Sequence, residues 1–303
     1  MPSPRNAAAF DIHTSITQAI VQAIENGIGE TRLPWARTGT PSVRPRNAVT
    51  KQAYRGINIL SLWLSAEQYG FTHGLWASYR QWLDAGAQVR KGEKGTLVVF
   101  YKDFTVDPNP DQADDDGSRR VARASWVFNA SQVDGYTLPG VPDLPPIERE
   151  GAAESFIAAT GADIRHGGDM AYYRPSTDHI QMPDERLFTG SKLSTRTEDY
   201  YSVLGHELTH WAGAETRLNR LMRARFGDEA YAMEELVAEL GAAFLCADLG
   251  ITHTPRADHA SYIAHWLKVL KDDKRAIFTA AAKASEAVAY LQAFANATEA
   301  VHA

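Results

Sequence analysis

The sequence predicts an α+β protein of two domains. A chain of 303 residues is long for one hydrophobic core. Four prolines fall within residues 138–147, which indicates a stiff, extended connector. Before this connector, helices alternate with strand-like segments, and after it helical periodicity dominates. We therefore expect a first domain at 1–137, a proline-rich linker at 138–149 and a second, mainly helical domain with a small antiparallel sheet at 150–303.

The composition is that of an ordinary soluble globular protein, with 44% hydrophobic and 22% charged residues. No apolar run has the length of a membrane span, and the N-terminus lacks a signal-peptide segment. We expect a cytoplasmic protein with no membrane partner. The single cysteine, Cys246, excludes an internal disulfide and a cysteine-rich metal site, and it lies in an apolar run typical of a core.

Charge is distributed unevenly along the chain. The formal net charge is −6, so the whole molecule does not resemble a nucleic-acid binder. Residues 32–102, however, contain 11 basic and 3 acidic side chains, a local net charge of +8. Such a local excess is what binding to phosphates requires.

The elements of the first domain follow from periodicity and turn residues. Isoleucines every four positions predict a helix over 10–28, and residues 33–49 indicate an extended loop. We expect a helix at 58–69 and another that opens at 72 or 73 and contains two tryptophans. Alternation predicts strands at 96–101 and 123–128. The acidic loop between them, 107–117, lacks the ligand spacing of a calcium loop and is interpreted as solvated.

Aromatic and cationic residues are interleaved in this first domain. A surface for single-stranded nucleic acid uses this combination, because bases stack on rings while cations follow the phosphates. Trp63, Trp76 and Trp82 have core-like spacing and favour packing instead. A cluster of charges is also often only a solvated face, which leaves both interpretations open. The candidates for DNA binding are Arg44, Arg46, Lys51, Tyr54, Arg55, Arg90, Lys91 and Lys94.

The second domain is expected to contain a small sheet and several helices. We predict a helix at 150–160, a strand at 163–166 and a hairpin formed by 171–174 and 178–182. The exposed edge of that hairpin suits strand addition by an extended peptide. Further helices are predicted around 200–213, from 228 to 246, at 258–271 and at 273–297.

The helix at 200–213 carries the pattern His-Glu-x-x-His. His206 and His210 are four residues apart and lie on one helical face, so both imidazoles can reach one ion. Glu207 is then placed to take a proton from water held at the metal. We expect Thr197 to cap the start of this helix and Gly213 to end it. Two surface histidines on an ordinary helix remain the alternative.

A third ligand is expected from the helix at 228–246. Glu235 and Glu239 lie four apart beside its apolar stripe, where unpaired carboxylates repel and a divalent cation relieves the repulsion. Thr216 stands where a metzincin has its third histidine, which favours a distal glutamate, the gluzincin arrangement. We choose Glu235 as ligand, with Glu239 supporting an imidazole or serving as the alternative ligand.

The sequence leaves other features of this site open. Two solvent-facing glutamates on an ordinary helix are the alternative to a third ligand, and a purely structural metal is the alternative to a catalytic one. Candidates for stabilising an oxyanion, by residue type only, are Tyr201, His253, Tyr262 and His265.

Five motifs stand out along the chain. They are Tyr-Arg-Gly-Ile-Asn at 54–58, Trp-x-x-Tyr-x-x-Trp at 76–82, the basic turn at 86–95, His-Glu-Leu-Thr-His at 206–210 and Glu-Glu-Leu-Val-Ala-Glu-Leu at 234–240. Together they resemble those of ArdC-type antirestriction proteins. The first three resemble the family's N-terminal single-stranded-DNA-binding domain, which also occurs in TraC-type primases. The last two resemble its zincin-like metallopeptidase domain. The resemblance covers nearly the whole chain.

The resemblance implies a protein that enters a recipient cell with conjugating single-stranded DNA and shields the plasmid from restriction. It implies zinc, or another divalent ion such as manganese, on His206, His210 and Glu235, with Glu207 as general base. Single-stranded DNA is the expected partner, and a host restriction–modification protein is a further candidate. The alternative function is an active metalloprotease that is recruited to DNA and cleaves a DNA-associated protein.

Overall fold

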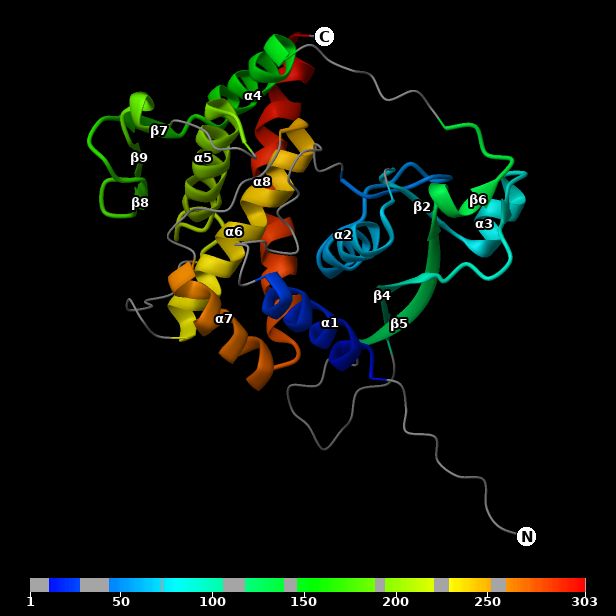
Figure 1. Ribbon diagram of the computed structural model, residues 1–303. Helices are drawn as coiled ribbons and strands as arrows, with labels where there is room; N and C mark the ends of the chain where they lie inside the picture. Colours follow the sequence, from blue (N-terminus) through cyan, green and yellow to red (C-terminus); the bar gives the residue numbers. More distant parts are fainter. Residues whose placement is uncertain are drawn as a thin grey trace.

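The computed structural model of the protein describes residues 11–27, 44–71, 73–105, 118–138, 146–188, 194–220, 229–251 and 260–302. Figure 1 shows the N-terminal strands on one side and the C-terminal helices on the other. Within the described ranges, no helix is long and apolar enough to cross a membrane. The predicted α+β class is confirmed.

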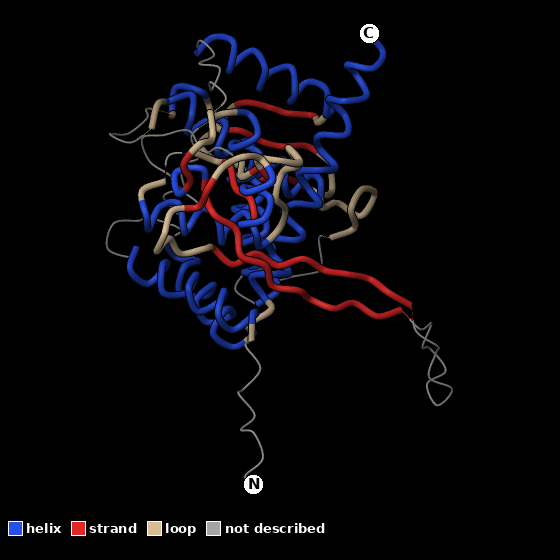
Figure 2. The backbone as a smooth tube through the Cα atoms, turned by 90° about the vertical axis from the view of Figure 1, so that its right-hand side faces the viewer, coloured by secondary structure: helices blue, strands red, loops and turns tan. Residues whose placement is uncertain are grey.

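The N-terminal part is built on a four-stranded sheet with the order β1-β2-β5-β4. Its strands are β1 (Arg46–Asn47), β2 (Leu75–Ser78), β4 (Thr96–Thr105) and β5 (Ser118–Asn129). A second, two-stranded sheet joins β3 (Gln88–Val89) to β6 (Val133–Asp134), which follows the short helix η1 (Ala130–Gln132). β4 and β5 form a long antiparallel hairpin that projects from the molecule in Figure 2. The strands predicted at 96–101 and 123–128 are confirmed and extend further. The acidic loop between them, 107–117, lies outside the described residues.

The helix predicted to open at 72 or 73 is wrong in its first half. Residues 75–78 form β2, and only α3 (Tyr79–Asp84) is helical. Ser78 ends the strand and caps the helix, because its hydroxyl accepts from the Gln81 amide while the Gln81 side chain accepts from the Ser78 amide. Trp76 and Trp82 are both buried, as core residues should be. Tyr79 lies three residues from each of them, and this i, i+3 spacing imitates a helix although Trp76 belongs to a strand and Trp82 to a helix.

Helix α2 (Ile57–Tyr69) is attached to the edge of the sheet by a buried amide. The side chain of Asn58 donates to the carbonyl of Val99 at 2.8 Å and accepts from the Val99 amide at 2.7 Å. Asn58 therefore supplies β4 with the two hydrogen bonds that a neighbouring strand would have made. The predicted helix at 58–69 is confirmed.

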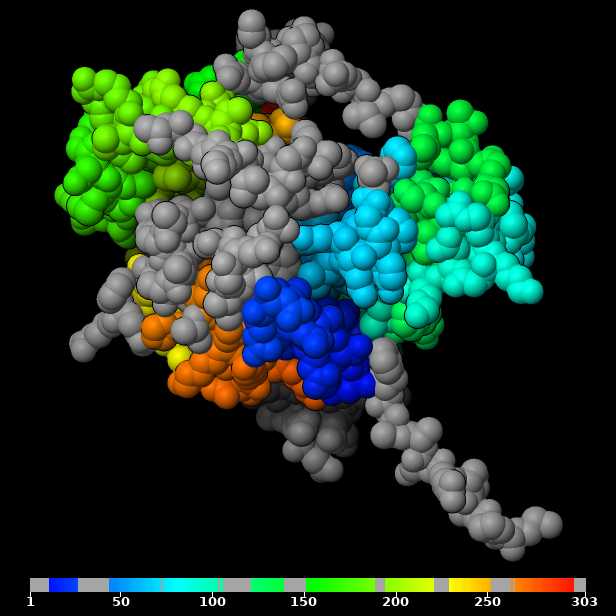
Figure 3. Space-filling model, in the orientation of Figure 1, coloured from blue at the N-terminus to red at the C-terminus, as the bar shows by residue number. Residues whose placement is uncertain are grey.

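One hydrophobic core joins the two halves of the chain. Ile16, Ile20 and Ile24 of α1 (Ile12–Gly27) belong to the same buried cluster as Trp266 and Leu291 in the C-terminal helices. Figure 3 shows α1, in blue, directly against α7, in orange. The isoleucine periodicity therefore predicted the helix correctly, and its apolar face is covered by α7 of the other half as well as by α2 of its own.

The C-terminal part is mainly helical. Its helices are α4 (Pro146–Thr160), η2 (Glu185–Leu187), α5 (Arg196–Ala212), α6 (Glu229–Leu249), α7 (Ala260–Asp272) and α8 (Ala276–His302). Its sheet has the order β7-β9-β8, with strands β7 (Asp163–His166), β8 (Tyr172–Arg174) and β9 (His179–Met182).

Two details of this part differ from the prediction. The hairpin of β8 and β9 is antiparallel as expected, but β7 pairs parallel to β9, so the sheet is mixed. α4 begins at Pro146, within the predicted linker, because proline is well suited to the first turn of a helix. Residues 139–145 of that linker lie outside the described ranges.

Candidate metal centre and nucleic-acid surface

Helix α5 presents His206 and His210 from a well-capped start. The hydroxyl of Thr195 accepts from the Glu198 amide at 3.1 Å, and the Glu198 carboxylate accepts from the Thr195 amide at 2.7 Å. This capping box replaces the cap predicted at Thr197 and starts the helix earlier. The helix ends at Gly213 as predicted, and His206 is buried while His210 is partly buried.

Helix α6 approaches α5 closely because small residues line the contact. A Cβ added at Gly241 would collide with the side chain of Thr209, and one at Gly205 would lie 3.5 Å from the backbone of Ala242. Thr209 is fully buried, and its hydroxyl donates a hydrogen bond to the Gly205 carbonyl at 2.8 Å. This approach brings Glu235 of α6 against the two histidines of α5.

Replacing Gly241 by alanine is expected to destabilise the fold by about 1–3 kcal/mol, because the added methyl group overpacks the α5–α6 contact. Metal affinity should fall as well, since Glu235 moves with α6. Adding Thr209→Ala to the same chain should restore most of both, because the nearest remaining atom would be the Cβ at 3.0 Å. Chemical denaturation and titration calorimetry with Mn(II) measure the two effects. Unchanged unfolding of the Gly241→Ala single variant would contradict the close contact.

His206, His210 and Glu235 converge on one point. The two Nε2 atoms are 3.1 Å apart, and each lies 3.5 Å from a different oxygen of Glu235. Zinc binds imidazole nitrogen at about 2.0–2.1 Å, so tetrahedral ligand atoms should lie about 3.3–3.4 Å apart. Among the described residues, these three form the group that could hold a metal ion. Their spacing and chemistry fit a divalent cation.

A glutamate lies behind each histidine. Glu239 Oε2 is 3.8 Å from Nδ1 of His206, and Glu234 Oε1 is 3.2 Å from Nδ1 of His210. Glu239 therefore lies on the side of His206 away from the convergence point, which suits support of the imidazole and not the role of alternative ligand. The sequence interpretation did not single out Glu234, although its place next to Glu235 in the glutamate run was the available signal.

Arg220 holds Glu234 in place. Its Nε and Nη2 atoms donate to the Glu234 carboxylate at 3.0 Å, and Nη2 also donates to the Thr209 carbonyl at 2.5 Å. The guanidinium passes over Gly213, where an added Cβ would lie 2.7 Å from Nη2. Gly213 has an ordinary φ of −78°, so the position requires glycine for space and not for its backbone conformation.

The carboxylates make the site attractive to a cation. Burial disfavours the charged imidazole of His206, but hydrogen bonds to Glu235 and Glu239 outweigh burial and raise its pKa to about 9. Burial likewise opposes ionisation of Glu235, yet His206 and His210 lower its pKa to about 2. Several buried carboxylates around two imidazoles are the environment in which a divalent ion is stabilised.

The remaining predicted catalytic residues have different outcomes. Glu207 is buried beside His206 on α5. Its role as general base stays a prediction. The hydroxyl of Tyr201 donates to Glu154 of α4 at 2.6 Å, so its assignment to an oxyanion is corrected to a packing role. His265 is exposed on α7, while His253 and the side chain of Tyr262 lie outside what the structure describes.

Tyr231 is a tyrosine that the sequence interpretation missed. It lies one turn before Glu235 on α6, and its hydroxyl hydrogen-bonds to the Glu235 carboxylate and favours the ionised form. This places a phenol beside one of the three candidate ligands and makes Tyr231 a candidate for stabilising an oxyanion.

Arg44 does not belong to a nucleic-acid surface. Its side chain is 7% exposed, and Nη1 donates to Asp248 of α6 at 2.6 Å. Nε donates to the carbonyl of Tyr54, and Gln292 of α8 donates to the same Asp248 carboxylate. The prediction of Arg44 as a DNA-binding residue is therefore wrong. A buried charge must be paired, and this pair connects the two halves of the protein.

The other predicted cations separate into two groups. Arg46, Lys51 and Arg55 line a groove, and Tyr54 contributes to its wall although the residue is only 6% exposed. Arg90, Lys91 and Lys94 are exposed near β3 and do not line this groove. Arg90 forms ion pairs with Glu93 at 2.9 Å and Asp134 at 3.4 Å, which indicates a structural role.

The groove contains cations that the sequence interpretation did not select. Arg80 and Arg275 also line it, together with the aromatic residues Phe100 and Tyr101. Arg275 comes from the turn before α8, more than 200 positions away in the chain, so no local pattern in the sequence could have connected it to Arg46.

Comparisons with known proteins assign a family model to each half of the chain. A model of the N-terminal domain of anti-restriction factor ArdC matches residues 10–132, and a model of zincin-like metallopeptidases matches residues 151–283. The predicted two-domain architecture is thus confirmed. The boundaries at 137 and 150 stay predictions.

Among solved structures, the antirestriction ArdC protein from plasmid R388 is similar in its metal-free form, with 37% identity and a TM-score of 0.77 over 95% of this chain and 98% of that chain. The Mn(II)-bound structure of the same protein has 38% identity and a TM-score of 0.75 over 94% and 98% of the two chains.

Two curated relatives are also similar over most of this chain. The uncharacterized protein y4eC of Sinorhizobium fredii (strain NBRC 101917 / NGR234) is 48% identical, over 93% of this chain and 92% of its own length. A DNA primase TraC of Escherichia coli is 36% identical over 93% of this chain, but the match spans only 27% of the primase. The full-length similarity to a solved antirestriction protein shows that this chain belongs to the ArdC family of antirestriction proteins, with a zincin-like domain and a divalent metal cofactor such as zinc or manganese.

Proposed function

We propose that this chain binds single-stranded DNA and protects incoming plasmid DNA from host restriction during conjugation. The proposal rests on the observation that three cations in the groove have no carboxylate partner within the described ranges. Arg46, Lys51 and Arg55 form no ion pair with any residue that the structure describes, although Arg44 and Arg90 nearby are both paired. Unpaired cations at a groove leave their charge available to phosphates. A protein with this role acts in the cytoplasm of the recipient cell.

Exposed aromatic side chains beside these cations support a single strand in particular. Phe100 and Tyr101 of β4 are each 49% exposed, an unusual position for large apolar rings in a strand. Bases that are not paired with a complementary strand stack on such rings. The next residue on β4, Lys102, is also exposed and adds a further cation along the hairpin.

The salt dependence of DNA binding tests this proposal. Each lost phosphate contact should reduce the slope of log affinity against log salt by about 0.7 for single strands, so Arg46→Ala with Arg55→Ala should reduce it by about 1.4. Arg90→Ala is the matched control, because its cation is already paired with carboxylates. Fluorescence anisotropy of a labelled oligothymidylate gives the slopes for the full chain. Binding by the wild type that does not depend on salt would sink the proposal, as would an equal loss in the control.

A second candidate function is peptide hydrolysis near DNA. The observation that favours it is the convergence of His206, His210 and Glu235, with Glu207 buried beside them. A bound divalent ion would polarise a carbonyl and make water more acidic. His206, His210 and Glu235 would hold that ion, the Glu207 carboxylate would take the proton of an attacking water, and the Tyr231 hydroxyl would stabilise the developing oxyanion. The edge strands of the β7-β9-β8 sheet are available for an extended peptide.

Restriction protection distinguishes the two candidates. A plasmid transferred by conjugation into a restricting recipient should survive more often when the donor supplies the wild type. A variant that lacks the groove cations Arg46 and Arg55 should lose this protection if DNA binding is the cause. Loss of protection only in a variant of Glu207 would instead favour hydrolysis as the protective step.

A further inference from the structure

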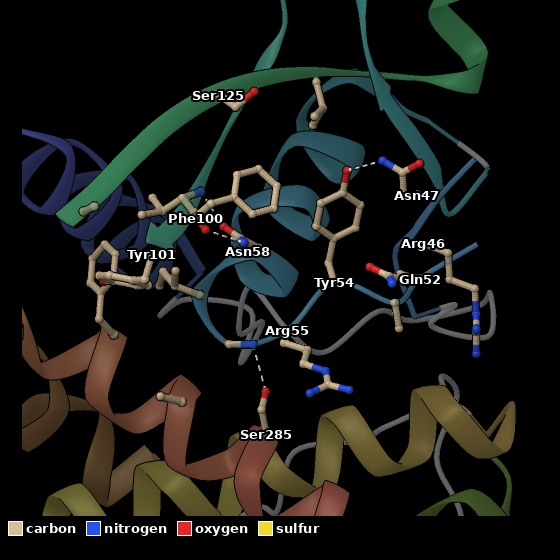
Figure 4. Close-up of a pocket in the computed structure, with 18 of the residues that line it drawn as sticks. Arg46, Asn47, Gln52, Tyr54, Arg55, Asn58, Phe100, Tyr101, Ser125 and Ser285 are labelled. Carbon is tan, nitrogen blue, oxygen red and sulfur yellow. Dashed lines mark hydrogen bonds between the residues drawn. The ribbon is translucent and has the colours of Figure 1, made fainter. Parts of the chain in front are cut away.

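The groove lies between the two halves of the protein. On one side are β1, which begins at Arg46, the loop that contains Arg55 and the hairpin that contains Phe100, and on the other side is α8 of the zincin-like domain. Its volume is about 2070 Å³. Figure 4 shows Tyr54 and Phe100 on the upper wall, with Arg55 and Ser285 below them.

The wall that α8 contributes is fixed to the N-terminal domain. The amide of Gly56 donates to the Ser285 hydroxyl at 2.8 Å, and a Cβ at Gly56 would lie 3.8 Å from Ala282. Gly56 has φ +56° and ψ −138°, a conformation that glycine adopts far more easily than other residues. Glycine thus allows the Tyr-Arg-Gly-Ile-Asn segment to turn on the surface of α8, with Arg55 left exposed beside it.

Part of the wall that α8 contributes is lined by small side chains, which leave room for a strand. Ala282, Ser285 and Ala289 recur at helical spacing and line the groove with small side chains. Arg275, at the turn before α8, is exposed and forms no ion pair within the described ranges. The α8 side therefore adds a cation, and small side chains cover the part of the wall from Ala282 to Ala289.

The charge of the whole groove suits a polyanion. Five cationic side chains line it, and Glu286 is the one carboxylate among the described lining residues. That carboxylate is already paired with Lys283 of the preceding turn at 2.8 Å. The cations are Arg46, Lys51, Arg55, Arg80 and Arg275. Arg80 is paired with Asp84 of α3 at 2.9 Å, whereas the other four form no ion pair within the described residues.

We infer that a single DNA strand lies along this groove and contacts both domains, with α8 as the second wall of the binding site. The inference rests on the proposed function and gives its DNA site a definite place. Phosphates lie against the four unpaired cations from both sides, and bases stack on Phe100 and Tyr101 of β4. The DNA site is consequently incomplete in the N-terminal domain alone.

Substitutions on the α8 side test the inference in the full chain. Arg275→Ala should weaken binding of a labelled oligothymidylate about two- to five-fold, the range of one exposed ion pair. It should also reduce the slope of log affinity against log salt concentration by about 0.7. Glu286→Gln should strengthen binding, because it removes the one negative charge of the groove. Lys268→Ala on α7 is the control: its exposed cation is paired with Glu229 at 2.9 Å and lies outside the groove, so binding should not change.

The outcomes separate the inference from the proposed function. If the wild type does not bind single-stranded DNA in a salt-dependent way, both are overturned. If Arg55→Ala weakens binding while Arg275→Ala and Glu286→Gln both behave as the Lys268→Ala control does, only the α8 wall is overturned. Phe100→Leu should weaken single-strand binding and leave duplex binding unchanged. Equal affinity of the wild type for a duplex of the same length would overturn the stacking arrangement and with it the single-strand inference.

Discussion

Glu207→Gln is expected to lower peptide hydrolysis by about 10²–10⁴-fold, the usual contribution of a general base. Glutamine has nearly the same shape as glutamate, so the buried position beside His206 should stay packed. Its amide, however, cannot take a proton from water. Metal affinity should change little, because Glu207 is not one of the three converging residues.

Cleavage of quenched fluorogenic peptides by the Mn(II)- or Zn(II)-loaded protein measures the first effect, and titration calorimetry measures the second. Glu215→Gln is the matched control, since Glu215 is exposed just beyond the end of α5. Equal hydrolysis by the Glu207→Gln variant and the wild type would exclude Glu207 as the base. A wild type without hydrolysis would leave the metal a structural role, and protection would then rest on DNA binding.

Glu234→Ala is expected to weaken metal binding about 10- to 100-fold, the typical cost of losing a group that orients a ligating histidine. The Glu234 carboxylate accepts a hydrogen bond from Nδ1 of His210 and is itself held by Arg220. Without Glu234, the His210 ring loses the partner that sets its orientation. Arg220 would also keep a guanidinium that is 93% buried without its carboxylate, since its side chain is only 7% exposed. The metal-free protein should therefore become less stable as well.

A conservative variant separates positioning from stability. Glu234→Gln keeps an oxygen that accepts from Nδ1, so its Mn(II) affinity should return most of the way to that of the wild type, although the charge pairing with Arg220 is lost. Glu229→Ala, at the exposed start of the same helix, is the control and should leave affinity unchanged. Calorimetric affinity is compared with the unfolding midpoint of the metal-free protein. If Glu234→Ala lowers only the midpoint, Glu234 has no positioning role.

Local patterns explain which elements the sequence could predict. The isoleucines of α1, the alternation in β4 and β5 and the two histidines one turn apart each depend on neighbours within a few residues. The segment around Trp76 imitates a helix because Trp76, Tyr79 and Trp82 recur every three residues, a spacing close to one helical turn. Only the cap at Ser78, which depends on the structure on both sides of it, decides between them.

The groove and the support of the metal site required the tertiary structure. Arg44 and Arg46 are two residues apart and have the same chemistry, yet one is buried against Asp248 and the other lines the groove. Burial of a charge depends on which distant carboxylate meets it, and a local sequence does not contain that information. The same holds for Arg220, which reaches Glu234 only because Gly213 leaves room for its guanidinium.

The chain by itself determined the chemistry of this protein: two imidazoles and a carboxylate for a divalent ion, and a basic, aromatic first half. These follow from residue types and short-range spacing, which helix geometry converts directly into shared faces. Only the tertiary structure decided which cations remain unpaired, that one core joins both halves, and that α8 faces the N-terminal domain across a groove. These are contacts between residues far apart in sequence, and packing and desolvation select them for the molecule as a whole.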